Sequence, residues 1–119
     1  MENKEFAKLL EERTKKFAIS IIKLSASLPG TMEGRVIRNQ ITKSGPSIGA
    51  NYREANRSRS KSDFRNKAAI CESESSETSY WLDIIKEMDW VNIQKLQPIC
   101  KEADELLAIF TSIGKNIKI

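Results

Sequence analysis

The sequence of 119 residues has no histidine, two cysteines and three prolines. Without histidine the chain lacks the usual general base near neutral pH and the commonest zinc ligand, which argues against most enzyme classes. Two cysteines are too few for a disulfide scaffold. Cys71 and Cys100 both fall on apolar helical rows, so we expect buried free thiols. Neither has a base to activate it, which disfavours a catalytic thiolate.

Long apolar runs are also missing. No stretch approaches the roughly 20 residues that cross a bilayer, and the N-terminal sequence MENKEFAKLLEERTKK lacks the apolar block of a signal peptide. The sequence therefore predicts a cytoplasmic protein with no membrane contact. A composition of 39% hydrophobic and 30% charged residues is typical of one globular domain, which we expect to span residues 1–119.

Apolar residues recur at intervals of three and four, which predicts an all-α fold without strands. Pro29 and Gly30 end the first helix, and the run from Asn56 to Ser62, which has no apolar residue, marks a later loop. Thr31, Ser60 and Asn92 are the expected N-caps, Ser60 forming a capping-box pattern with Asp63. Four helices of similar length with short connections bury their apolar rows best as an antiparallel up-down-up-down four-helix bundle. The expected helices span residues 3–28, 32–57, 61–89 and 92–117.

Each predicted helix has an apolar row that we expect to be buried, and the third has a second row beside the first. From the two rows we predict a wide buried face on the third helix. The expected rows are Phe6, Leu9, Leu10, Phe17, Ile21, Leu24 and Leu28; Ile37, Ile41, Ser44, Ile48, Tyr52 and Ala55; Phe64, Ala68, Cys71, Ser75, Thr78, Leu82 and Ile85, with Ile70, Glu74, Glu77, Trp81, Ile84 and Met88 beside them; and Leu96, Ile99, Cys100, Ala103, Leu106, Leu107, Phe110, Ile113 and Ile117.

The second predicted helix contains Gly45 and Pro46 in its middle. Proline removes a backbone hydrogen bond and crowds the preceding turn, so this helix either breaks into two pieces or continues with a kink. The neighbouring helices are expected to be about 40 Å long at 1.5 Å per residue. Only an unbroken second helix could cover them, so we predict a kinked, continuous helix.

The charge is segregated along the chain, although the net value is only +4. Residues 35–67 contain nine basic and two acidic side chains, whereas the rest of the chain contains eleven and fourteen. We expect the basic group of the second half of the second helix, the following loop and the first turn of the third helix to meet at one end of the bundle, where it would attract phosphate backbones without base-specific contacts. A solvated helical surface is the alternative interpretation. The candidate nucleic-acid-binding residues are Arg53, Arg57, Arg59, Lys61, Arg65 and Lys67.

Several polar residues lie on or beside the apolar rows, where an unpaired buried charge would be costly. We expect Arg13 to pair with Glu74 or Glu77, within a polar network that sets helix register or within a subunit interface. A carboxylate site is the alternative, but di-iron bundles need Glu-x-x-His motifs and this chain has no histidine, so we expect no metal or other cofactor. The residues of the expected network or interface are Arg13, Gln40, Asn51, Glu54, Glu74 and Glu77.

Three segments resemble one family. Residues 40–55 (QITKSGPSIGANYREA), residues 62–67 (SDFRNK) and residues 74–82 (ESSETSYWL) are similar to the bacterial 23S rRNA intervening-sequence proteins. The resemblance implies an antiparallel four-helix bundle that forms a ring-like homopentamer, and it implies little about activity. Accessory proteins of diversity-generating retroelements are similar to this family and engage nucleic acid with a basic pentameric bundle. Gly45-Pro46 departs from the alanine-type residue that the family pattern favours.

The leading functional hypothesis is therefore a non-enzymatic oligomeric protein that binds RNA or DNA non-specifically through its basic surface. The alternative is a protein–protein scaffold or accessory subunit with no nucleic-acid contact, whose basic surface docks an acidic patch. An enzyme is the third possibility, and we expect no small-molecule substrate. Trp81 is expected in core or interface packing, whereas Tyr80 could pack or stack on a base.

Overall fold

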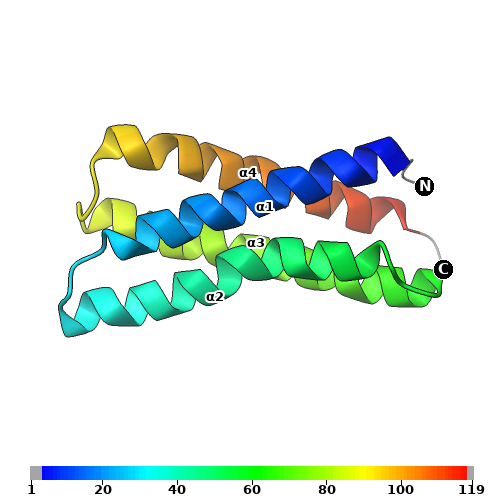
Figure 1. Ribbon diagram of the computed structural model, residues 1–119, viewed down its shortest axis with the longest axis horizontal. Coiled ribbons are helices and arrows are strands. Elements are labelled where there is room, and N and C mark those ends of the chain that lie inside the picture. Colours follow the sequence, from blue (N-terminus) through cyan, green and yellow to red (C-terminus); the bar gives the residue numbers. More distant parts are fainter. Residues whose placement is uncertain (1–3, 118–119) are drawn as a thin grey trace.

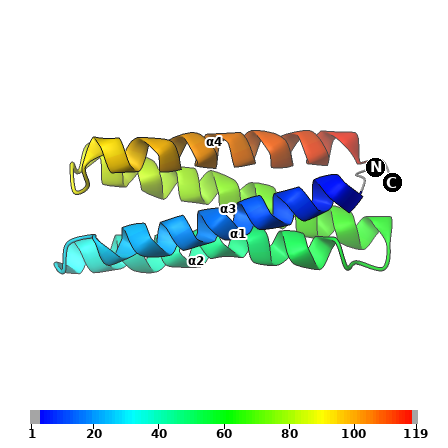
Figure 2. The same cartoon turned by 45° about the horizontal axis from the view of Figure 1, so that its top comes forward.

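The computed structural model describes residues 4–117, which form four α-helices. The helices are α1 (Lys4–Ala26), α2 (Met32–Ala55), α3 (Lys61–Glu87) and α4 (Ile93–Asn116). Successive helices run in opposite directions and lie side by side (Figures 1 and 2). The predicted all-α bundle is confirmed, and the helix limits differ from the prediction by at most two residues. The predicted start at residue 3 lies outside the described residues.

Side-chain caps begin three of the helices, as predicted. The hydroxyl of Thr31 accepts from the amide of Gly34 at 3.1 Å, and that of Ser60 accepts from Asp63 at 3.0 Å. The side-chain oxygen of Asn92 accepts from Gln94 at 2.8 Å. Each cap satisfies an amide that has no partner within its own helix. Short connections between capped helices keep consecutive helices adjacent.

The second helix is continuous through Pro46, which confirms the unbroken alternative. Its ribbon changes direction near the middle (Figure 1). Gly45 is buried, and a Cβ atom placed on it would lie 2.8 Å from Cγ2 of Ile21. Gly45 therefore allows α1 and α2 to approach closely, so the glycine has a packing role beside the proline.

The core lies between the four helices and contains most of the predicted apolar rows. Tyr52 of α2 and Phe110 of α4 meet across its centre with their ring centroids 5.5 Å apart, at an edge-to-face angle of 67°. Buried hydroxyls are satisfied within the bundle, since Thr78 donates to Ser44 across α2 and α3 at 2.9 Å. The predicted core residues that are buried are Leu10, Phe17, Ile21, Leu24, Leu28, Ile41, Ser44, Ile48, Tyr52, Ala55, Ala68, Cys71, Ser75, Thr78, Leu82, Ile85, Leu96, Ala103, Leu106 and Phe110.

Two parts of the core prediction are wrong. Phe6 and Leu9 are 41% and 60% exposed, because they lie in the first turns of α1, the helix that makes few contacts with α4. The second row of α3 is not part of a wide buried face either. Ile70, Glu77 and Met88 are exposed and the other members of that row are half-buried, because this row lies at the outer edge of the contact between α2 and α3.

The two ends of the bundle differ in the segments that they bring together. The loop between α2 and α3 lies at the same end as the start of α1 and the end of α4 (Figure 1). The other two connections lie at the opposite end. None of the four helices, as described from residue 4 to residue 117, is both long and apolar enough to cross a membrane.

Candidate nucleic-acid interface

The candidate interface is the end of the bundle that holds the loop between α2 and α3. We call its six predicted residues the basic end: Arg53, Arg57, Arg59, Lys61, Arg65 and Lys67. The loop is ordered by its own hydrogen bonds, since the amide of Asn56 donates to the carbonyl of Tyr52 at 3.1 Å and the hydroxyl of Ser58 donates to that of Ala55 at 2.6 Å. The loop therefore holds its arginines in a defined position relative to both helices.

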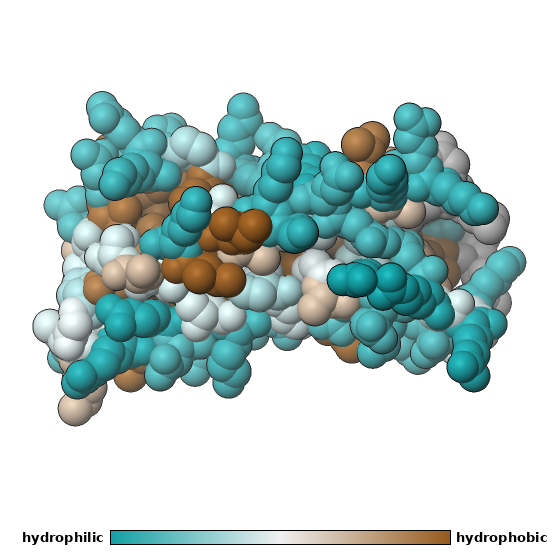
Figure 3. All heavy atoms as spheres, in the orientation of Figure 1, coloured by the Kyte–Doolittle hydropathy of each residue, from teal (hydrophilic) through white to brown (hydrophobic). Residues whose placement is uncertain are grey.

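The side chains of the basic end face solvent. All of them are exposed except Lys67, which is half-buried. Among residues 4–117, the ion pairs within 4.0 Å are made by Arg13, at a different place in the fold. Within the described part of the chain, the cations of the basic end therefore have no direct carboxylate partner. Figure 3 shows hydrophilic side chains dominating this half of the visible face, whereas apolar side chains gather in the other half.

The basic end is spread around the bundle axis. Arg53 lies one turn after Gly49, which packs against Thr14 of α1. Arg65 lies one turn before Ala69, which lines a groove between α3 and α4. The six residues share one end of the molecule but not one face, because α2 and α3 present different sides to solvent there.

The rest of the basic segment lies elsewhere. Arg38, in the first half of α2, donates to the carbonyl of Ser25 at 3.1 Å and to that of Leu28 at 2.8 Å. It thereby satisfies carbonyl groups at the end of α1. Arg35 and Arg38 occupy the opposite half of α2 and are not part of the basic end.

Sequence reasoning missed the contribution of α1 to this region. The first half of α1 lies beside the second half of α2, since Glu11 accepts a 2.8 Å hydrogen bond from Asn56. Lys8 and Lys15 are exposed on this part of α1. Their separation of seven residues, which places them on the same side of a helix, was the available signal. Counting charge along one continuous segment did not reveal it.

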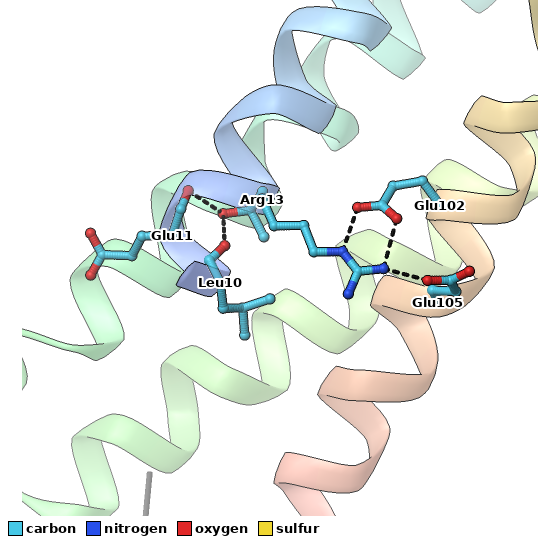
Figure 4. Close-up of polar contacts among 6 residues, drawn as sticks. Leu10, Glu11, Arg13, Glu102 and Glu105 are labelled. Atoms are coloured by element: carbon cyan, nitrogen blue, oxygen red, sulfur yellow. Dashed lines mark hydrogen bonds and ion pairs between the residues drawn. The ribbon is translucent and has the colours of Figure 1, made fainter. Parts of the chain in front are cut away.

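Arg13 does not pair with Glu74 or Glu77, so that prediction is wrong. Figure 4 shows its guanidinium extending from α1 to two carboxylates of α4. The distances are 2.6 and 2.7 Å to Glu102 and 2.5 Å to Glu105. Hydrogen bonding to Glu102 is the main cause that raises the pKa of Arg13, and burial opposes it. The position of Arg13 beside an apolar helical row predicted that it pairs with a carboxylate. The same row could not predict that α4 supplies this carboxylate.

The other predicted polar residues gather on an outer surface. We call this surface the α2–α3 face; it comprises Gln40, Lys43, Asn51 and Glu54 of α2 and Ile70, Glu74, Glu77, Trp81, Ile84 and Met88 of α3. Asn51 donates to the carbonyl and hydroxyl oxygens of Ser47, both at 2.9 Å, and Trp81 donates to Glu77 at 3.1 Å. These bonds stay within single helices, so the residues do not form a buried network between helices.

The surroundings of one carboxylate on this face, that of Glu74, shift its pKa. Burial raises the pKa of Glu74 above its ordinary value, the charge of Glu77 raises it further, and the charge of Lys43 opposes both. Glu77 lies about one turn from Glu74 on α3, so its charge and the burial of Glu74 together oppose ionisation of Glu74.

The two cysteines lie within the bundle, and a surface groove lies between α3 and α4. Cys71 is buried, as predicted, and burial raises the pKa of its thiol to about 12. Cys100 is half-buried, and burial likewise raises its pKa. Tyr80 is 59% exposed beside the groove between α3 and α4 and packs edge-to-face on Trp81. Within residues 4–117, no three cysteine, aspartate or glutamate side chains are placed to hold a metal ion.

Known proteins share the sequence pattern and the fold of this chain. Residues 9–117 match the family described as 23S rRNA-intervening sequence protein. The chain belongs to this family. A crystal structure of a protein with unknown function from the S23 ribosomal protein family of Bacteroides thetaiotaomicron VPI-5482 superposes with a TM-score of 0.81. It is 33% identical to this chain and covers 89% of it, and the match includes 98% of that protein.

The resemblance to the 23S rRNA intervening-sequence proteins is therefore confirmed across nearly the whole chain. No curated protein matches the sequence significantly. Neither the family description nor the Bacteroides protein indicates a catalytic activity. The surfaces of this intervening-sequence protein are therefore the features that bear on its function.

Proposed function

We propose that this intervening-sequence protein is a non-enzymatic oligomeric bundle that binds the phosphate backbone of RNA or DNA. The observation that carries the proposal is the basic end, where six cationic side chains from α2, α3 and their loop share one end of the bundle and five are exposed. When such side chains bind nucleic-acid phosphates, they displace the counterions condensed on those phosphates. Release of the counterions favours binding without base contacts.

Binding of this kind is expected to be indifferent to base sequence. Phosphate contacts position a protein on nucleic acid but carry no sequence information. The cations of the basic end point in several directions around the bundle axis, so they suit a charged backbone better than a row of base edges. A single end supplies few contacts and would bind weakly on its own.

Oligomerisation would multiply this weak contact, and the family resemblance favours a homopentamer. The α2–α3 face supports self-association, because its exposed and half-buried apolar side chains, Ile70, Trp81, Ile84 and Met88, lie in one row. Several basic ends on one assembly would bind with higher avidity than one. Molar mass measured by light scattering tests this part, and a monomer at micromolar concentration contradicts it.

The same α2–α3 face favours a second candidate function, a scaffold or accessory subunit that binds another protein and no nucleic acid. Apolar side chains rimmed by polar ones are typical of protein interfaces. A partner that remains bound after nuclease treatment would favour this function. A partner released by nuclease would favour the first.

The main test is binding of a labelled generic duplex and a structured RNA across a salt series. The logarithm of the affinity should fall linearly with the logarithm of salt concentration. Replacing Arg53, Arg57, Arg59 and Arg65 by alanine should remove most of the binding. The matched control replaces four lysines away from this end, Lys16, Lys23, Lys95 and Lys101. Affinity that is indifferent to salt, or equal losses in both variants, contradicts the proposal.

A further inference from the structure

The seam between α1 and α2 places lysines of one helix beside arginines of the other. Glu11 accepts from Asn56 across the seam at 2.8 Å. Close by, a Cβ atom on Gly49 would lie 3.0 Å from the hydroxyl oxygen of Thr14, so the two backbones are in near contact there. These contacts set which residues of α1 stand opposite which residues of α2.

Four cations flank these contacts. Lys8 lies one turn before Glu11, and Arg57 directly follows Asn56; Lys15 directly follows Thr14, and Arg53 lies one turn after Gly49. All four side chains are exposed. We call Lys8, Lys15, Arg53 and Arg57 the α1–α2 cationic face.

The nearby acidic groups do not cancel this charge. Glu11 is half-buried and engaged by Asn56, and Glu12 lies one turn from both Lys8 and Lys15. Within the described part of the chain, none of the four cations has a carboxylate within 4.0 Å. The face therefore has four cations beside two carboxylates, and its remaining positive charge is available to an external anion.

The two halves of the bundle carry opposite charge excess. Helices α1 and α2 contain ten basic and five acidic side chains, whereas α3 and α4 contain seven and nine. The groove between α3 and α4 is itself lined by Glu72 and Glu77. The field of the whole molecule thus directs a polyanion to the side formed by α1 and α2.

We propose that the α1–α2 cationic face binds double-helical nucleic acid lying along the seam, with its phosphates on Lys8, Lys15, Arg53 and Arg57. The inference rests on the proposed function and adds a face and a duplex to it. Lys8 and Lys15 are about 10 Å apart along α1. Arg53 lies in the last turn of α2, and Arg57 lies in the turn that follows this helix. A duplex carries roughly one charge per 1.7 Å of its axis, so several phosphates face this array.

A rigid duplex suits this face better than a flexible single strand. Lys8, Lys15 and Arg53 stand on α1 and α2, and Arg57 stands on the hydrogen-bonded turn that directly follows α2. The contacts of Glu11 with Asn56 and of Thr14 with Gly49 hold the two helices in register. When a rigid polyanion binds such a fixed array, neither the nucleic acid nor the protein loses much conformational entropy. Most of the contact energy therefore contributes to affinity. A single strand would lose conformational freedom to follow the same array.

The test compares two pairs of lysines on the same helix. The first variant is Lys8→Gln with Lys15→Gln, and the control is Lys16→Gln with Lys23→Gln. The control has the same spacing of seven residues and the same change of charge, and all four lysines are exposed. Anisotropy of labelled 20-base-pair RNA and DNA duplexes, and of single strands of the same length, is measured over a salt series. Circular dichroism checks that each variant keeps its helix content.

We expect the first variant to bind duplex at least about tenfold more weakly at 0.1 M salt and to lower the salt slope by about two. The control should lose less than about threefold. Equal losses in the two variants overturn the inference, as does tighter binding of single strands than of duplexes by the unmodified protein.

Failure of the inference is distinguishable from failure of the proposed function. If Arg53→Gln with Arg57→Gln weakens binding while the Lys8 and Lys15 variant does not, the contact is confined to the basic end and the inference is wrong. If the unmodified protein binds none of the duplexes or strands at 50 mM salt, the proposed function fails and the inference fails with it.

Discussion

The two sides of α1 are held to the bundle by different physical means. On the side that faces α2, α1 packs directly against the backbone of α2 at Gly45 and Gly49, which have no side chain. Toward α4, which it contacts far less, it is bridged by the guanidinium of Arg13 with Glu102 and Glu105. One seam depends on close approach of two helices, and the other on charges at the surface.

The difference indicates what each seam contributes to stability. Close packing excludes water and cannot be replaced by longer side chains without moving a helix. A partly exposed ion pair exchanges hydration for an attraction that salt screens. We therefore expect α4 to be held chiefly by its buried side chains rather than by its bridge to α1.

The largest effect should come from Phe110→Ala. Phe110 is fully buried in α4 and packs edge-to-face on Tyr52. Truncating it leaves a cavity, so the free energy of unfolding should fall by about 3–5 kcal/mol. Urea unfolding followed by circular dichroism measures this. A loss no larger than that of an Arg13 variant would contradict the view that the core holds α4.

The next largest effect on the free energy of unfolding is expected at Gly45, with Gly114 as its control. Gly45→Ala places a methyl group against Ile21 and should lower the free energy of unfolding by about 1–2 kcal/mol, after the gain in helix propensity is deducted. Gly114→Ala is the matched control, because its Cβ atom would be 3.5 Å from a carboxylate oxygen of Glu72, an ordinary contact. The control should raise stability by up to about 1 kcal/mol. Equal effects in the two variants would show that the seam between α1 and α2 tolerates widening.

A smaller effect is expected for Arg13→Met. The bridge is about one-third exposed, so its loss should lower the free energy of unfolding by less than about 1 kcal/mol at low salt. The difference from the unmodified protein should shrink at 1 M salt, where the Debye length is about 3 Å. A double-mutant cycle with Glu102→Gln measures the coupling. A loss that salt leaves unchanged would show that Arg13 contributes by packing instead.

The smallest effect concerns Glu74 and depends on pH. Burial first and Glu77 second raise its folded-state pKa above the ordinary value of 4.5. A raised carboxyl pKa means that ionisation costs the folded state stability as pH increases through and above that range. Glu74→Gln should therefore be slightly more stable than the unmodified protein at pH 7 and equal to it at a pH well below the ordinary carboxyl pKa. Unfolding at both pH values tests the sign, with Glu87→Gln as the control.

The helices and most of the core could be predicted from the sequence, because both are local. Spacings of three and four between apolar residues, the caps at Thr31, Ser60 and Asn92, and the Pro29-Gly30 pair limit each helix without reference to its neighbours. The continuity of α2 through Pro46 followed from the lengths of the adjacent helices. The exposed basic end was also predicted, because a loop between two helices lies at the surface.

The errors concern which helix lies next to which side chain. A helical row places Arg13 at the edge of an apolar surface, but either neighbouring helix could supply its carboxylates. The second row of α3 has the same spacing as the first, and only packing against α2 leaves it at the surface. Lys8 and Lys15 join Arg53 and Arg57 only because α1 and α2 run antiparallel.

The sequence by itself determined four helices, their inward rows and a concentration of positive charge near one loop, because period, capping and composition act within a few residues along the chain. The tertiary structure alone decided the partner of Arg13, the exposure of the α2–α3 face and the joining of lysines and arginines on the α1–α2 cationic face. These depend on the order and direction in which helices pack, which bring together residues as far apart in sequence as Glu11 and Asn56, 45 positions, or Arg13 and Glu102, 89 positions.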